Sequence, residues 1–153
     1  MKKLLLVTFI ILLQSYGILF GQTESATGNI KGTLTWQYNK YVGTKPDVDA
    51  LVYVIKEFQE DIRQYKTRAN GYGNYEINDI PVGNYFVVLI SFNTTQNPKE
   101  GIYWGKLGAS LSDKQKEHLR NMGLGDWKYK IIEIKIKENK TVDVSHDFGN
   151  TYY

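Results

Sequence analysis

Residues 67–87 read TRANGYGNYEINDIPVGNYFV, and this stretch decides the fold. Tyr75 and Ile77 are separated by a single polar residue, and Tyr85 and Val87 repeat the same spacing after a short interruption. A period of two places such residues on one face of a β-strand, with the intervening side chains on the other face. The stretch therefore predicts two short strands with their large apolar side chains turned toward a core.

Turn-forming residues divide this stretch into its strands. Asn70-Gly71 favours positive φ and predicts a hairpin between the strand before it and the strand after it. Pro81 and Gly83 predict a tight corner before the second strand, because proline presets φ and glycine accepts conformations closed to other residues. All of these features explain folding, and none of them indicates a catalytic or binding site.

The same period of two continues on both sides of this stretch. About seven short strands at this spacing predict an all-β Greek-key sandwich, in which Val52, Val87 and Ile134 point inward. The expected strands cover residues 29–36, 50–58, 65–68, 74–77, 85–92, 132–137 and 142–148, and residues 37–49 are expected to form a loop.

A more specific pattern runs through the same residues. It reads Thr67-x-x-Asn70-Gly71-x-Gly73-x-Tyr75-x-Ile77-x-x-Ile80-Pro81-x-Gly83-x-Tyr85-x-Val87 and resembles the signature of carboxypeptidase regulatory-like domains. These domains belong to the transthyretin-like, or prealbumin-like, β-sandwiches, and the resemblance covers residues 28–92. It implies a structural motif and an adhesive, stalk-like or accessory role. The long loop at 37–49 and the insert at 93–128 depart from the family's pattern.

The insert, residues 93–128, interrupts the all-β rhythm. Ser112 is a plausible N-cap, and a helix is expected to run from there to about Met122 with Gly123 as its C-cap. The apolar stripe of this helix is narrow. Because the insert is much longer than an ordinary connection between strands, a local function is expected there.

Two of the expected strands are apolar on both faces, whereas a two-sheet sandwich needs only one buried face per sheet. The second face is therefore expected to be covered, since large apolar side chains left in water form a sticky patch. The favoured cover is the insert, and the alternative is a partner protein or a second copy of the chain. This second face consists of Leu51, Tyr53, Ile55, Phe86, Val88 and Ile90.

Aromatic residues in and beside the insert form the candidate binding surface: Tyr103, Trp104, Trp127 and Tyr129. Exposed aromatic rings flanked by glycine and polar residues suit stacking on sugar rings. The same rings also suit anchoring of the insert to the sheet, since aromatic side chains bury large areas. The same two interpretations apply to Trp36, Tyr38 and Tyr41.

No catalytic, metal or cofactor site is expected. His118 and His146 are the only histidines, and no pattern around them is typical of a metal site. Four aspartates lie in or beside loops without the spacing of a calcium loop, namely Asp47, Asp49, Asp79 and Asp126. A transthyretin-like hydrolase is the less favoured alternative, because its resemblance requires more histidines and a different C-terminus than 149–153 provides. We therefore expect a protein that is not an enzyme.

The N-terminus has the pattern of a secretory signal peptide. Lys2 and Lys3 precede an apolar run from Leu4 to Leu13, and a segment with a small residue at each end, from Gly17 to Gly21, follows after three more residues. The expected organisation is a signal peptide at 1–22, a flexible lead-in at 23–28 and a single β-sandwich domain at 29–153. An uncleaved anchor is the alternative, although the run is short for a membrane span.

Composition limits the choice of partner and compartment. The 153 residues carry a formal charge of +3, and removal of Lys2 and Lys3 leaves +1, which argues against a nucleic-acid partner. There is no cysteine, so disulfides and thiolate chemistry are excluded. An exported domain without disulfides fits a bacterial protein better than a small secreted animal protein.

These observations predict an exported, non-catalytic module in the periplasm, on the cell surface or in the medium. We expect it to contact an envelope protein or a glycan through the insert and the second apolar sheet face. A soluble carbohydrate-binding protein that uses its exposed aromatics is the alternative. A homodimer is compatible with both interpretations.

Overall fold

The computed structural model describes residues 25–151, so the expected signal peptide lies outside the described residues. Nine strands and two short helices make up this part of the chain. In chain order they are β1 (Thr27–Asn39), β2 (Gly43–Pro46), β3 (Leu51–Lys56), β4 (Lys66–Arg68), β5 (Asn74–Pro81), β6 (Gly83–Thr95), α2 (Leu107–Ser110), α3 (Asp113–Asn121), β7 (Trp127–Ile136), β8 (Thr141–Asp143) and β9 (His146–Asn150).

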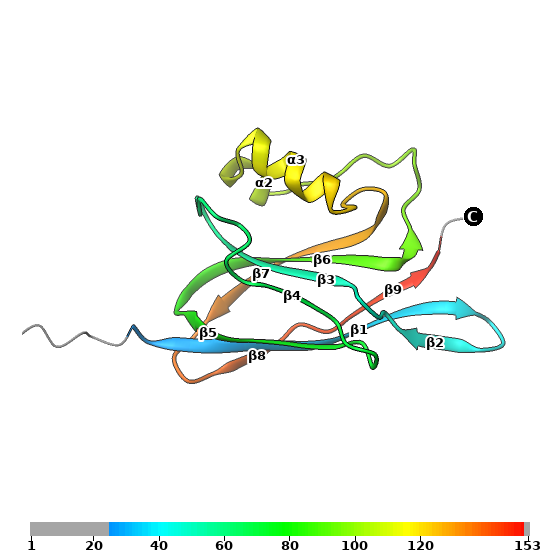
Figure 1. Ribbon diagram of the computed structural model, residues 1–153, viewed down its shortest axis with the longest axis horizontal. Coiled ribbons are helices and arrows are strands. Elements are labelled where there is room, and N and C mark those ends of the chain that lie inside the picture. Colours follow the sequence, from blue (N-terminus) through cyan, green and yellow to red (C-terminus); the bar gives the residue numbers. More distant parts are fainter. Residues whose placement is uncertain (1–24, 152–153) are drawn as a thin grey trace, which may run out of the picture.

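The strands form two stacked sheets, and the predicted all-β sandwich with a helix-containing insert is confirmed (Figure 1). One sheet has the order β4-β3-β6-β7. The other has the order β2-β1-β5, and β8 and β9 also pair with β1. The two helices lie above the four-stranded sheet, on the side away from the five-stranded sheet (Figure 1).

The long strand β1 is the centre of the five-stranded sheet. At Lys31 it pairs with Glu76 of β5 and with Asp143 of β8, and further along it pairs with β2 and β9. The pairing with β8 and β9 is parallel. The single strand expected at 142–148 is divided at Val144 and Ser145, which lie between β8 and β9.

Several boundaries differ from the sequence expectation because backbone pairing extends beyond the apolar pattern. The loop expected at 37–49 contains β2, which pairs with the end of β1 although both carry mainly polar residues. β1 begins at Thr27, so the last two residues of the expected lead-in are part of a strand. β5 continues to Pro81, whose partner across the sheet is Thr27.

The hairpin predicted at Asn70-Gly71 is wrong. β4 before this turn pairs with β3, whereas β5 after it pairs with β1, so the turn carries the chain from one sheet to the other. The Asn70 side-chain Oδ1 accepts hydrogen bonds from the N–H groups of Tyr72 at 2.9 Å and Asn74 at 3.1 Å. The positive φ belongs to Gly73, at 76°, and not to Gly71.

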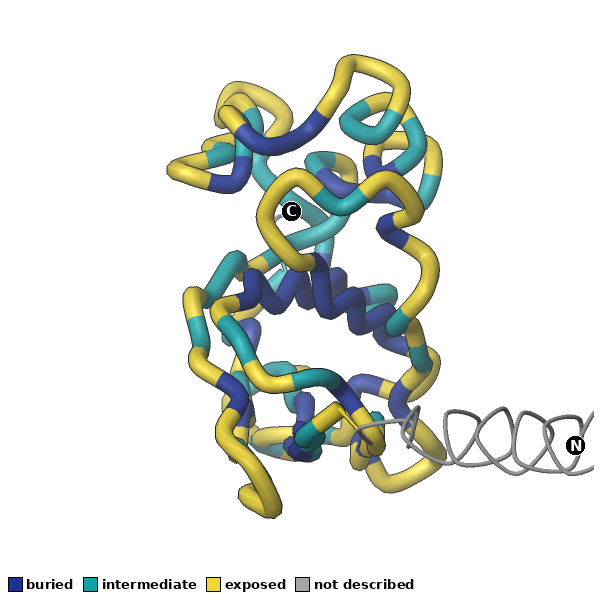
Figure 2. Tube along the Cα trace, turned by 90° about the vertical axis from the view of Figure 1, so that its left-hand side faces the viewer, coloured by how far each residue is buried: buried dark blue, intermediate teal, exposed yellow. Residues whose placement is uncertain are grey.

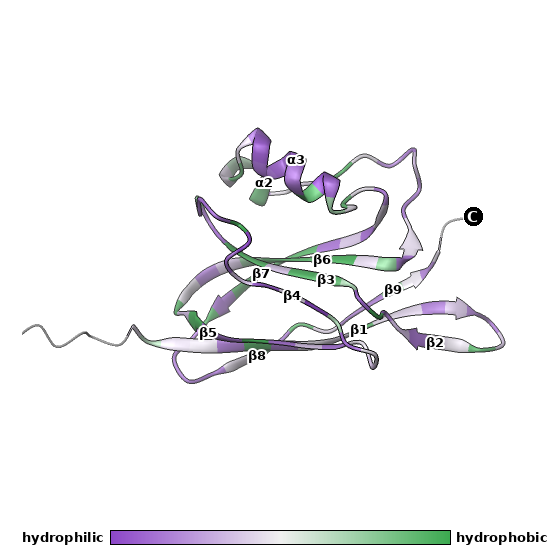
Figure 3. Ribbon diagram, in the orientation of Figure 1, coloured by the Kyte–Doolittle hydropathy of each residue, from purple (hydrophilic) through white to green (hydrophobic). Residues whose placement is uncertain are grey.

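Within residues 25–151 there are two hydrophobic cores, one between the sheets and a second core on the other face of the four-stranded sheet. Strands β3 and β6 supply alternate side chains to both, so Val52 and Val87 enter the core between the sheets while Tyr53 and Val88 enter the other. Buried residues accordingly concentrate in this middle layer (Figure 2), and β3 and β6 are its most apolar strands (Figure 3). Ile134 packs half-buried against the core between the sheets, as expected.

The insert covers the second face of this sheet, as the favoured interpretation predicts. All six residues of that face belong to one core with Leu107, Leu119 and Leu124 of the insert and Ile62 of the β3–β4 connection. The predicted contact with a partner through this face is therefore wrong, because the chain itself buries the face.

Among the described residues, no helix has the length and apolar character needed to cross a bilayer.

Candidate functional site

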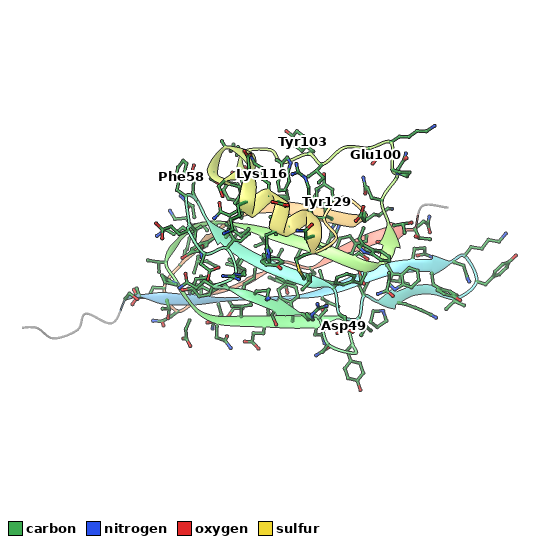
Figure 4. The ribbon with its side chains drawn as sticks, turned by 45° about the horizontal axis from the view of Figure 1, so that its top comes forward. Asp49, Phe58, Glu100, Tyr103, Lys116 and Tyr129 are labelled. Atoms are coloured by element: carbon green, nitrogen blue, oxygen red, sulfur yellow. The ribbon has the colours of Figure 1, made fainter. Side chains whose placement is uncertain are left out.

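Three of the four aromatic residues predicted as a binding surface border a groove between the insert and the edge strand β7, namely Tyr103, Trp104 and Tyr129. The groove has a volume of about 660 Å³. Residues 103–107 form one wall, residues 129–133 of β7 form the other, and Phe86 and Gln96 complete the lining. Tyr103 and Tyr129 lie on the side of the molecule that carries the insert (Figure 4).

Two tyrosines join the walls of the groove. The backbone N–H of Tyr103 donates a hydrogen bond to the Tyr129 hydroxyl over 2.5 Å. Tyr129 is half-buried against the second core, whereas the Tyr103 side chain is 81% exposed. One ring is therefore fixed by packing and the other stands in solvent at the entrance, where it is free to contact a ligand.

Trp104 follows at the wall formed by the insert. Its ring packs partly against the second core, and the Arg120 guanidinium lies 5.5 Å from the ring centroid. A cation over one face of the indole holds it in place and leaves less of the ring for a ligand. Trp104 therefore both anchors the insert and lines the groove.

An ion pair crosses between the two walls. The Lys106 Nζ lies 3.0 Å from the Glu133 Oε2, and both side chains are more than half exposed, at 77% and 54%. An exposed pair of this kind adds little stability, at most about 1 kcal/mol. It places a hydrogen-bond donor, the Lys106 ammonium, and an acceptor, the Glu133 carboxylate, beside the aromatic rings.

The fourth predicted residue, Trp127, is separate from the lining of this groove. Its ring meets Phe92 edge to face, with centroids 5.9 Å apart, and packs against the second core. A Cβ at Gly123 would stand 2.6 Å from the indole. Trp127 thus anchors the insert to the sheet, which is one of the two roles expected for these aromatics.

The polar members of the groove were not predicted. Lys106 and Glu133 are far apart in the sequence, and Gln96 lies near the start of the insert. Nothing in the order of residues places them together, because the insert must fold back over the sheet before they meet.

A second cavity of about 670 Å³ lies between the β3–β4 connection and α3, and no sequence signal indicated it. The Gln115 side-chain amide donates to the carbonyls of Gln59 at 2.7 Å and Glu60 at 2.8 Å, so it ties the helix to the connection. The Phe58 side chain is 72% exposed at its rim. His118, on the helix side, has its Nε2 3.4 Å from the Tyr53 hydroxyl.

The remaining sequence candidates do not form a site. Among the described residues, no three acidic or histidine side chains gather as a metal ion requires. His146 packs edge to face on Phe148 at 4.8 Å between centroids, and burial lowers its pKa, helped by the charge of Lys130. Asp47 is buried, whereas Asp49 and Asp79 are exposed.

The groove combines stacking surfaces with hydrogen-bonding groups, a combination that suits reversible binding of a ligand. Its aromatic rings offer faces to a ligand, and its amide, ammonium and carboxylate groups offer directed contacts. None of these groups is arranged as a nucleophile beside a base.

No family model and no curated protein matches the chain. Solved structures that resemble it include the Bacillus anthracis TIE protein, at 13% identity and a TM-score of 0.48, over 82% of this chain and 17% of that one. The minor pilin of Streptococcus agalactiae has 15% identity and a TM-score of 0.44, over 84% of this chain and 47% of that one. A "putative carbohydrate binding protein" of Pseudomonas aeruginosa has 10% identity and a TM-score of 0.47, over 83% and 92%.

This chain thus spans less than two thirds of the length of the first two structures. At these identities and TM-scores the likenesses assign neither a family nor an activity. The similarity of residues 67–87 to carboxypeptidase regulatory-like domains remains a resemblance.

Proposed function

We propose that this chain is an exported, non-catalytic binding module of the bacterial cell envelope and that its aromatic groove binds a glycan. Export is supported by the N-terminal pattern of two lysines followed by an apolar run. Glycan binding is supported by the groove between the insert and β7.

The observation that carries the proposal is the exposure of Tyr103 beside polar side chains. A side chain that is 81% exposed contributes little to folding, so its aromatic ring is available to a ligand. Sugars present apolar faces together with hydroxyl groups. Such a ligand is able to stack on the ring while its hydroxyls bond to Lys106 and Glu133.

The groove is organised before a ligand arrives. The hydrogen bond from Tyr103 to Tyr129 and the ion pair between Lys106 and Glu133 connect the insert to β7 at two points. A wall already held in place loses little conformational freedom on binding, which favours affinity.

The proposed absence of catalysis is supported by the positions of the two histidines. His118 contacts Tyr53 beneath the insert, and His146 contacts Phe148 in the other sheet. Within the described residues, neither ring has a hydrogen bond to a carboxylate that would orient it as a general base.

A glycan array probed with residues 23–153 tests the proposal, since this segment contains both cores. We expect binding to a defined group of glycans, and Tyr103→Ala to weaken it by roughly tenfold through loss of one stacking contact. Tyr72→Ala is the matched control, because Tyr72 is equally exposed, at 80%, in the β4–β5 turn.

Two results would count against this function. No binding on the array, combined with retention of an envelope protein on the immobilised chain, would indicate a protein ligand. Equal binding by the Tyr103→Ala variant and the unaltered chain would place the glycan elsewhere on the surface.

A further inference from the structure

The hairpin formed by the end of β1 and by β2 projects beyond the rest of the sandwich (Figure 1). Its strands pair from Thr35 with Pro46 to Asn39 with Gly43. The Asn39 side-chain Oδ1 accepts hydrogen bonds from the N–H groups of Tyr41 at 2.9 Å and Val42 at 2.8 Å, so the tip is an ordered turn. The groove and its walls lie elsewhere, on the insert and β7.

Large apolar side chains gather at this tip in contact with water. Tyr41 is 85% exposed, Val42 is 56% exposed and Tyr38 is 42% exposed. Neither core includes any of the three. The Tyr38 ring meets Trp36 edge to face, with centroids 5.5 Å apart, so it has one packing contact. The exposure of Tyr41 and Val42 has no such explanation in folding and points to a surface that they contact.

The charge of the hairpin is entirely positive. Lys40 and Lys45 lie within it, and no acidic residue occurs between Lys31 and Asp47. The Lys45 Nζ lies 3.8 Å from the centroid of the Tyr38 ring, and the Lys40 Nζ lies 4.9 Å from that of Tyr41. Each ammonium group is thus held beside an aromatic ring.

We propose that this hairpin docks on the surface of an anionic lipid bilayer. Tyrosine rings favour the level of the lipid headgroups, where the ring is partly in hydrocarbon and the hydroxyl remains hydrated. Val42 at the tip enters the acyl boundary, and the lysines meet lipid phosphates. The combination of aromatic and basic residues is typical of elements that lie in this interface.

The exposure of Tyr41 favours a bilayer over a small ligand. Tyr103 stands beside a groove whose opposite wall is β7, whereas Tyr41 lies at the tip of a projecting two-stranded hairpin and is 85% exposed. Such a tip has no second wall with which to enclose a sugar or a peptide side chain. A bilayer instead surrounds a projecting tip and needs no concave site. The hairpin is separate from the glycan groove. If the hairpin does not bind lipid, the proposed glycan binding is unaffected.

Co-sedimentation with vesicles tests this inference. The chain from Thr23 to Tyr153 is mixed with vesicles of phosphatidylcholine alone and of phosphatidylcholine with phosphatidylglycerol, since the expected signal peptide would itself bind lipid. We expect binding to the anionic vesicles only, and its loss at high salt.

Matched variants separate the hairpin from general electrostatic attraction. A lysine near an anionic surface contributes about fivefold to binding, so Lys40→Gln with Lys45→Gln is expected to weaken binding by about 25-fold. Lys135→Gln with Lys137→Gln makes the same change of charge on exposed positions outside the hairpin and is expected to weaken it less than about threefold. Tyr41→Ser is expected to reduce binding, and Tyr72→Ser to leave it unchanged.

Thermal unfolding of each variant checks that the fold is retained. We expect it to be retained, because the substituted side chains are exposed. The inference is overturned if the unaltered chain stays in solution with anionic vesicles. It is also overturned if the two lysine pairs, or the two tyrosine variants, weaken binding equally.

Discussion

Gly73 holds the turn that carries the chain from one sheet to the other. Its φ of 76° lies in the left-handed region, and a Cβ placed on it would stand 2.3 Å from the carbonyl oxygen of Leu34. Gly73 also accepts a hydrogen bond from the Leu34 N–H at 2.8 Å. The absence of a side chain is therefore needed for both the turn and the close approach to β1.

We expect Gly73→Ala to destabilise the protein by about 3 kcal/mol or more, because backbone strain and a clash with backbone act together. Gly71→Ala is the control, since nothing stands within 4 Å of its Cβ position, and its effect should lie within about 1 kcal/mol. Urea denaturation measures both. Equal effects would show that the turn adapts to a side chain at position 73.

Asp47 is a second residue with a structural role that its loop position conceals. It is fully buried, and its Oδ1 accepts hydrogen bonds from the Asn93 amide at 2.6 Å and the Phe92 N–H at 3.4 Å. The other carboxylate oxygen, Oδ2, is buried without a partner among the described residues. Burial raises the pKa of Asp47 above its ordinary value of 3.8, and the hydrogen bonds only partly oppose this effect.

Asp47→Asn is expected to stabilise the protein at pH 7. The folded protein holds the Asp47 proton more tightly than the unfolded chain, so the free energy of unfolding falls as the pH rises from 3.8 through the raised pKa. Asparagine has no charge to bury, so the advantage of the variant should appear over this interval and vanish at lower pH. Urea denaturation across this pH range measures the difference.

Asp49→Asn is the matched control, because the Asp49 side chain is exposed and its positive φ suits asparagine. It should change stability little at any of these pH values. An Asp47→Asn variant that is less stable than the unaltered chain at pH 7 would mean that the buried charge is compensated.

At the scale of elements, α3 owes its position to its cap and to one buried side chain. Ser112 is the N-cap, as predicted, and it forms a capping box with Gln115. Gln115 also donates a hydrogen bond to the β3–β4 connection, so one residue both caps the helix and ties it to this connection. Leu119 is the only residue of the helix that is fully buried.

Leu119→Ala is expected to cost about 2–5 kcal/mol, because it leaves a cavity between α3 and the sheet. Glu117→Ala, at an exposed position of the same helix, should change stability by less than about 0.5 kcal/mol. Thermal unfolding compares the two, and a dye that binds apolar surface should respond only to Leu119→Ala. Similar melting temperatures would mean that the helix is not part of the cooperative fold.

At the scale of the whole molecule, the four-stranded sheet is a middle layer between the other sheet and the insert. Its strands β3 and β6 are apolar on both faces because both faces are buried. The second core contains Tyr53, Val88 and Ile90 from the sheet and depends on the insert for its cover.

Replacing residues 97–125 with a short glycine-serine linker is therefore expected to expose the second face and make the protein associate. Burial of each large side chain on that face contributes about 1.5–3 kcal/mol, and an exposed patch regains this energy by self-association. Analytical ultracentrifugation measures the change against the unaltered chain. A soluble monomeric variant would mean that the sheet tolerates exposure of this face.

The sequence alone determined the two-sheet sandwich, most of its strands with their inward residues, and the N-cap of α3, because period-two and capping patterns are local properties of the chain. It also grouped Tyr103, Trp104, Trp127 and Tyr129 as one surface, since the insert carries or adjoins all four, and three of them line the groove. Tertiary structure decided which strands pair and which distant side chains meet. The Asn70-Gly71 turn changes sheets, β2 forms from polar residues, and Lys106 meets Glu133 across the groove.

The physical reason lies in the range of the interactions. A hydrophobic period reports which face of a strand is buried, but a backbone hydrogen bond has the same chemistry whichever strand is the partner. The partner is selected only when the cores close. For that reason the second face could be expected to be covered, while the groove that its cover creates required the folded molecule.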